Sequence, residues 1–225
     1  MGKFLRFLGI FFMGITSALI ILSGVGTSCV AFSPDTFAVD SLAGIADYQW
    51  LYIFYVISFI LFGIMGVRAT ISLVRGKENA YRNTIIVLVL SIIVGGIHTA
   101  TSRALRNGSS MPLDIIVYTA IFTLLLFLLF NVPKIKQMVG FEEGGSNGKT
   151  AAGGMTAIVA GMLVASVQMW AGPTHIFDGV NLADTFHTQM MVAGGILFFL
   201  GMGVLVYAII KSAPASVPQE KGVSA

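Results

Sequence analysis

The strongest constraint in this sequence is a series of six long apolar segments joined by short polar connections. A stretch of roughly 20 apolar residues is long enough to cross the hydrocarbon core of a bilayer as a helix. The sequence therefore predicts an all-α fold, a polytopic membrane bundle of six transmembrane helices. The predicted spans cover about residues 7–32, 50–74, 83–101, 114–132, 151–170 and 189–210.

Positive charge is distributed unevenly between the connections. Of the 13 Lys and Arg residues, all except Arg103 and Arg106 lie in or beside the N-terminus, the second and fourth connections, and the C-terminus. Cytoplasmic segments of membrane proteins carry an excess of Lys and Arg. We therefore expect a multi-pass protein of a prokaryotic cytoplasmic (inner) membrane with both termini in the cytoplasm. Residues 1–211 form the membrane domain, and residues 212–225 are predicted to be a disordered cytoplasmic tail.

The composition excludes several classes of protein. Hydrophobic residues make up 56% of the chain and charged residues 10%, against about 45–50% and about 25% in soluble domains. The basic residues lie at the predicted membrane edges, so the lipid bilayer rather than nucleic acid is the expected partner. The connection over residues 134–150 is polar and rich in glycine, and we expect it to be a flexible linker.

Small residues recur at helical spacing in several spans. Helices in lipid gain little from burying apolar groups against each other, so small residues that allow close backbone approach mark their contacts. The clearest series, on the fifth span, is predicted to be a helix-packing ridge, against another helix of this chain or against a partner subunit. It consists of Gly153, Ala157, Gly161 and Ala165, and weaker pairs are Gly14 with Ala18, Ser91 with Gly95, and Gly194 with Gly201.

All three histidines fall on the predicted outer side: His98, His175 and His187. Histidines near the ends of two different helices can supply both axial ligands of a haem. One hypothesis is therefore haem b held by His98 and His187. Residues 186–195 include Phe186-His187-Thr188-Gln189 and a following glycine pair. They resemble a haem-ligating helix of the haem-copper oxidase large subunits, a local resemblance that implies haem ligation by His187.

A second hypothesis for the same face is a copper or similar metal site. Met190 and Met191 follow His187 at offsets of three and four, which places sulfur on the same helix face as the imidazole. His98 and His187 would contribute imidazole ligands, and the other candidate ligands are His175, Met190, Met191 and Asp178. The alternative interpretation is that the histidines are polar residues of helix contacts and of the membrane interface, without a cofactor.

No motif in the sequence identifies a catalytic reaction. The spans also carry few charged residues at mid-depth, whereas ion and proton transporters usually keep such residues there. Our leading hypothesis is a non-catalytic accessory or structural subunit of a larger membrane protein complex. The alternative is an electron-transfer protein with haem b as its cofactor, and binding or transport of a lipid, a quinone or another small molecule is a third class.

Overall fold

The computed structural model describes residues 2–32, 44–106, 110, 113–141, 147–177 and 180–212. It confirms six helices that are long and apolar enough to span a membrane, which suggests a multi-pass membrane protein. The predicted tail after Ser212 lies outside the described residues. The six long helices are α1 (Gly2–Phe32), α3 (Gln49–Arg75), α4 (Ala80–Arg106), α5 (Leu113–Phe130), α7 (Asn147–Ala165) and α10 (His187–Ser212).

Shorter elements occupy two of the connections. Helix α6 (Pro133–Val139) follows α5 directly, with proline in its first turn, where the missing N–H costs no hydrogen bond. Between α7 and α10 lies a segment that we call the cap, which consists of the described residues 166–177 and 180–186. The elements of the cap are α8 (Val167–Trp170), the 3-10 helix η2 (Gly172–Thr174), the antiparallel strands β1 (Ile176–Phe177) and β2 (Val180–Asn181), and α9 (Leu182–Thr185).

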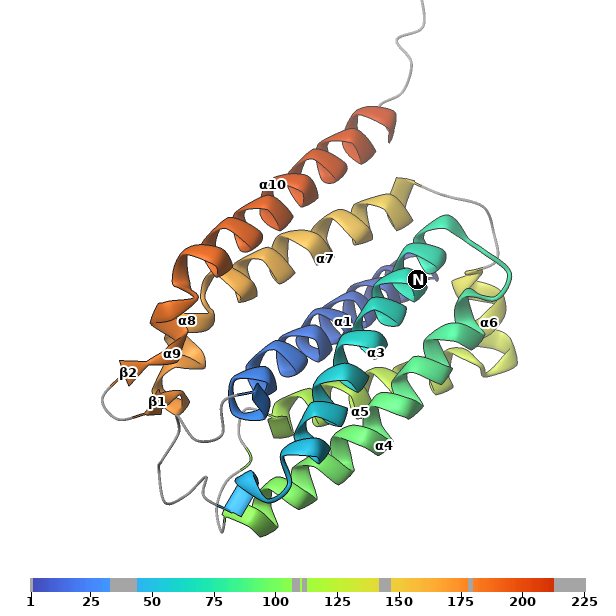
Figure 1. Cartoon of the computed structure of the whole chain (residues 1–225). Coiled ribbons are helices and arrows are strands. Elements are labelled where there is room, and N and C mark those ends of the chain that lie inside the picture. The colour runs from blue at the N-terminus through green and yellow to red at the C-terminus, as the bar shows by residue number, and fades with distance from the viewer. Residues whose placement is uncertain are drawn as a thin grey trace, which may run out of the picture.

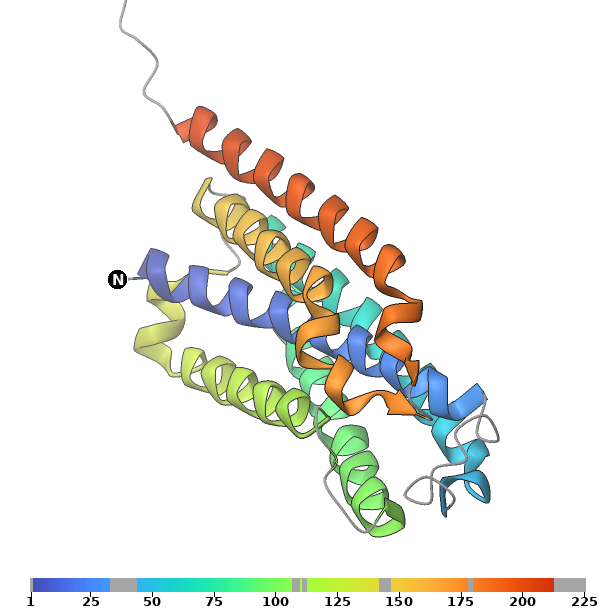
Figure 2. The same cartoon turned by 90° about the vertical axis from the view of Figure 1, so that its left-hand side faces the viewer.

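Four of the long helices form a closed ring. Helix α1 packs against α3 and α5, and α4 packs against the other sides of α3 and α5. Helix α7 lies along α1 and α3, and α10 packs almost entirely against α7. Figures 1 and 2 show α10 as the outermost helix and the cap beside the end of α1. We call the end of the bundle where α1 ends and α3 begins the pocket end.

The interior has two apolar clusters, one toward each end of the bundle. The cluster at the pocket end includes Ile20, Tyr55, Phe59 and Leu113, and the opposite cluster includes Ile10, Leu73, Phe127 and Phe130. Between them, the hydroxyls of Thr16 on α1 and Thr123 on α5 are 2.8 Å apart and share a hydrogen bond. A polar contact of this kind fixes the register of two helices that are otherwise held by apolar packing.

The α7–α10 contact is built on glycines. A Cβ at Gly161 would lie 2.6 Å from the carbonyl oxygen of Gly194, and a Cβ at Gly201 would lie 2.7 Å from the carbonyl oxygen of Gly154. Of the predicted ridge on the fifth span, Gly161 and Ala165 lie at this contact. The other two residues lie differently: Gly153 is next to Val74 of α3, and Ala157 is half-buried.

The connection predicted as a flexible linker contributes two ordered pieces, α6 and the first turn of α7. Lys149 is fully buried, and its ammonium donates a 3.0 Å hydrogen bond to the carbonyl oxygen of Phe141. Arg6 of α1 donates from Nε to the carbonyl oxygen of Val139. The carbonyl of Val139 lies at the C-terminus of α6, and that of Phe141 lies just after it. Backbone oxygens at a helix C-terminus lack partners within the helix and attract cations. The basic residues there therefore contribute structure as well as charge asymmetry.

Candidate functional site: a neutral cavity at the pocket end

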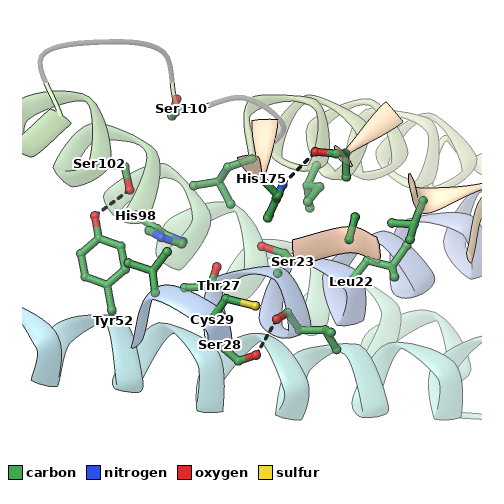
Figure 3. Close-up of a pocket in the computed structure, with 18 of the residues that line it drawn as sticks. Leu22, Ser23, Thr27, Ser28, Cys29, Tyr52, His98, Ser102, Ser110 and His175 are labelled. Atoms are coloured by element: carbon green, nitrogen blue, oxygen red, sulfur yellow. Dashed lines mark hydrogen bonds between the residues drawn. The ribbon is translucent and has the colours of Figure 1, made fainter. Parts of the chain in front are cut away.

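A cavity of about 230 Å³ opens at the pocket end of the bundle (Figure 3). The last three turns of α1 form one wall, and α3, α4 and α5 contribute Tyr52, His98 and Ile116. The cap and the first turn of α10 close the remaining side with Trp170, His175 and Met190 among others. The cavity therefore lies where the four-helix ring meets the cap.

Most of the cavity surface is apolar, and the polar side chains described in its lining are hydroxyls, a thiol and imidazoles. Its polar residues are Ser23, Thr27, Ser28, Cys29, Tyr52, His98, Ser102, Ser110 and His175. None of the described residues that line it is Asp, Glu, Lys or Arg. A largely apolar cavity with a few converging polar groups is the usual form of a small-molecule site.

His98 is deeply buried, with 3% of its surface exposed. Its imidazole stacks on the ring of Tyr55 at a centroid distance of 4.2 Å and an interplanar angle of 21°. The rings of Tyr52 and Phe59 lie 5.4 and 5.6 Å away. Three aromatic residues of α3 thus fix the orientation of this side chain in the cavity wall.

The Nδ1 atom of His98 has no hydrogen-bond partner among the described residues. Leaving a buried polar atom unpaired costs about 1–3 kcal/mol, and native structures contain few such atoms. Ser23 of α1, which lines the same cavity, is 7% exposed, and its hydroxyl also lacks a described partner. Two unpaired polar groups on different helices therefore border one cavity.

Hydrogen bonds between α3 and α4 hold the histidine side of the cavity. The hydroxyl of Tyr52 is 3.0 Å from the hydroxyl of Ser102, and that of Tyr55 is 3.2 Å from the hydroxyl of Thr101. Both tyrosines also contact His98 through their rings. The residues that surround the imidazole are thus themselves tied to its helix, so the pocket wall is preorganised.

An ion pair joins α4 to α5 at the edge of the cavity. Arg103 donates to Asp114 at 2.9 Å and to the hydroxyl of Ser110 at 3.0 Å, and Ser110 donates to Asp114 at 2.7 Å. The side chain of Arg103 is half-exposed and that of Asp114 is buried. Only Ser110 of these three lines the cavity, so the charges stabilise the rim while the interior stays neutral.

The cavity exists partly because position 26 carries no side chain. A Cβ at Gly26 would meet a single atom within 4 Å, Nε2 of His175, at 3.8 Å. His175 belongs to the cap, and its Nδ1 is 2.8 Å from the carbonyl oxygen of Ala171. Gly26 therefore marks open space between α1 and the cap, and a larger residue there would fill it.

The predicted ligand sets are only partly brought together. His98, His175 and Met190 line the cavity, whereas His187 and Met191 are not among its lining residues. Asp178 lies outside the described residues. Within the part of the chain that the structure describes, no group of three or more His, Cys, Asp or Glu side chains could hold a metal ion.

The geometry around His98 fits a haem poorly. One face of the imidazole is covered by Tyr55, and Val117 of α5 occupies the space above Gly95, 2.9 Å from where a Cβ would lie. A cavity of about 230 Å³ is below the roughly 300–1,000 Å³ of sites for drug-sized ligands, and the macrocycle is larger than such ligands. Haem binding by His98 and His187 stays a prediction without support from the cavity.

Several cavity residues have no sequence signal of their own. Ser23 and Gly26 belong to a span with many small residues, and Tyr52 belongs to an aromatic group typical of a membrane interface. Their role follows only from the way α1, α3 and α4 are brought together. Comparison with known proteins adds no assignment: the chain matches no protein-family model, no curated protein and no solved structure.

Proposed function

We propose that the chain is a multi-pass protein of a prokaryotic cytoplasmic membrane that binds a small neutral molecule in the cavity at the pocket end. Both termini lie in the cytoplasm in this proposal, so the cavity is at the outer side of the membrane. The observation that carries it is a largely apolar cavity without a charged group among its described lining residues, which two buried polar residues from different helices, His98 and Ser23, help to line.

The surrounding structure supports the binding of a small molecule. The aromatic stack and the Tyr52–Ser102 hydrogen bond hold His98 in place before any ligand arrives, which lowers the ordering cost of binding. The cavity lies beside the membrane interface, where an apolar molecule dissolved in the bilayer would have short access to it. Arg103 and Asp114 at the rim form an ion pair with each other, so neither charge needs a partner on the ligand.

The test compares two phenylalanine substitutions at glycines. Gly26→Phe fills the cavity, whereas Gly203→Phe adds the same side chain on α10, where no atom would lie within 4 Å of a new Cβ. Each protein is purified in nanodiscs and extracted, and the co-purified small molecules are quantified by mass spectrometry. We expect a neutral compound with the wild type and Gly203→Phe and at least a tenfold loss in Gly26→Phe. Equal amounts in all three folded proteins, or none in any, would contradict the proposal.

A second candidate function is the accessory or structural subunit of a larger membrane complex. The supporting observation is the position of α10, which packs on α7 and buries only Gly194, Gly201 and Ala208 among its residues. Its outer face exposes large apolar side chains such as Phe199 and Ile210, which either lipid or another subunit can cover. Native mass spectrometry from mild detergent distinguishes a free protein from a subunit of a complex, since a monomer without partners would argue against the subunit role.

A further inference from the structure

We propose that the molecule bound in this cavity is the head group of a quinone or of the corresponding hydroquinone. This inference rests on the proposed function, because it names the ligand class of the same cavity. Such a head group is a flat, neutral ring that carries two oxygens on opposite sides. Charge, hydrogen bonding and shape of the cavity each select for these properties.

The charge of the lining selects a neutral ligand. Among the described lining residues there is no carboxylate, ammonium or guanidinium group, and a charged ligand group buried without a partner is strongly disfavoured. The nearby guanidinium of Arg103 is held by Asp114 and Ser110. Phosphate, carboxylate and ammonium head groups of lipids therefore have no counter-ion in the cavity.

Two polar residues of the lining, His98 and Ser23, suit a ligand that has two oxygens. Nδ1 of His98 on α4 and the hydroxyl of Ser23 on α1 belong to different helices that border the cavity (Figure 3). A serine hydroxyl donates and accepts, and a neutral imidazole does either at a given nitrogen according to its tautomer. The two residues can therefore donate to the carbonyls of a quinone and also pair with the hydroxyls of a hydroquinone.

The walls and the volume select a flat ring. Aromatic residues line the cavity from three segments: Tyr52 of α3, Trp170 of α8, and Phe186, the cap residue between α9 and α10. Aromatic rings pack well against other π-systems in offset or edge-to-face geometry. A volume of about 230 Å³ suits one ring or two fused rings rather than a whole isoprenoid lipid, so a tail would remain outside.

The native sequence contains a reporter for this site, because Cys29 is the single cysteine of the chain and lines the cavity. The experiment measures the rate of Cys29 modification by N-ethylmaleimide in nanodiscs, with thermal unfolding as a parallel readout. The probes are ubiquinone-1 and menaquinone-1, whose ring positions are substituted and do not add thiols. The comparison ligand is 1,4-dimethylnaphthalene, which has a fused ring and no oxygens.

We expect both quinones to slow the labelling saturably by at least about threefold and to raise the unfolding temperature, while dimethylnaphthalene has little effect. Ser23→Ala and His98→Phe should each weaken quinone protection about tenfold, the size expected when one buried hydrogen bond to the ligand is lost. If His98→Phe fails to fold, Ser23→Ala and the ligand comparison still decide the result.

Three outcomes overturn the inference in distinguishable ways. Equal protection by the quinones and dimethylnaphthalene would show that the cavity binds flat rings without recognising the quinone oxygens. The proposed function would then stand, and the quinone assignment would fail. Protection that is unchanged in both variants would exclude His98 and Ser23 as the recognising groups. No protection and no thermal shift with any ligand, together with unchanged co-purification in Gly26→Phe, would exclude the cavity as a binding site altogether.

Discussion

A buried polar side chain affects stability in opposite ways, depending on whether it has a partner. Ser17 and Ser23 are both buried on α1, but only the hydroxyl of Ser17 has a described hydrogen-bond partner. The hydroxyl of Ser17 donates to the carbonyl oxygen of Met13 at 2.7 Å, whereas that of Ser23 has no described partner and lines the cavity. The pair therefore forms a matched experiment on the empty protein.

We expect Ser23→Ala to raise the free energy of unfolding of the ligand-free protein by about 1 kcal/mol, because it removes an unpaired buried hydroxyl. Ser17→Ala should lower it by up to about 1 kcal/mol, because it removes a made hydrogen bond. Thermal unfolding in detergent, after removal of co-purified molecules, measures both. A destabilised Ser23→Ala protein would show that its hydroxyl has a partner, such as a bound water, in the empty cavity.

Residue-level prediction from the sequence succeeds where a residue type is rare and fails where it is common. His98 is a candidate site residue from the sequence as well as from the structure, because a histidine in an apolar span is unusual. Ser23 and Gly26 are two of many small residues on α1, and nothing in their spacing separates a cavity wall from a packing seam. Only the positions of α4 and the cap make that distinction.

At the scale of the helix, the α7–α10 contact shows why a period of four residues misleads. Each step of four residues turns about 40° around an α-helix, whereas a step of seven returns to within about 20° of the same direction. The series that begins at Gly153 therefore drifts from α3 toward α10. Gly154 with Gly161, and Gly194 with Gly201, keep the seven-residue spacing and meet across the contact.

We expect Gly161→Ala to destabilise the α7–α10 pair by about 1–3 kcal/mol, because the new methyl group meets the backbone of α10 and forces the helices apart. The matched control is Gly195→Ala, where no atom would lie within 4 Å of the Cβ and where alanine favours the helix. Unfolding in mixed micelles measures the difference. Equal stability of the two variants would show that α10 is not held at this seam.

At the scale of the whole molecule, the charge asymmetry has two exceptions, Arg103 and Arg106, and the structure accounts for the first of them. Arg103 lies at the pocket end, opposite to most of the basic residues, but it pairs with Asp114 and carries little net charge to bias insertion. The opposite end holds Arg75 and Lys77, which border the turn at Gly76, whose positive φ of 66° ends α3. With six antiparallel spans, the start of α1 and the end of α10 lie at that same end (Figure 1).

We therefore expect Lys77 to face the cytoplasm and Ile176, which is exposed in β1 of the cap, to face the outside. The measurement uses a Cys29→Ser background with either Lys77→Cys or Ile176→Cys and a membrane-impermeant maleimide on intact cells. Ile176→Cys should be labelled directly, and Lys77→Cys only after permeabilisation, because the excess of Lys and Arg keeps its connection inside. The reverse pattern would place the cavity on the cytoplasmic side. Quinone binding would then occur at the inner membrane surface, while the residues that recognise the ring would be the same.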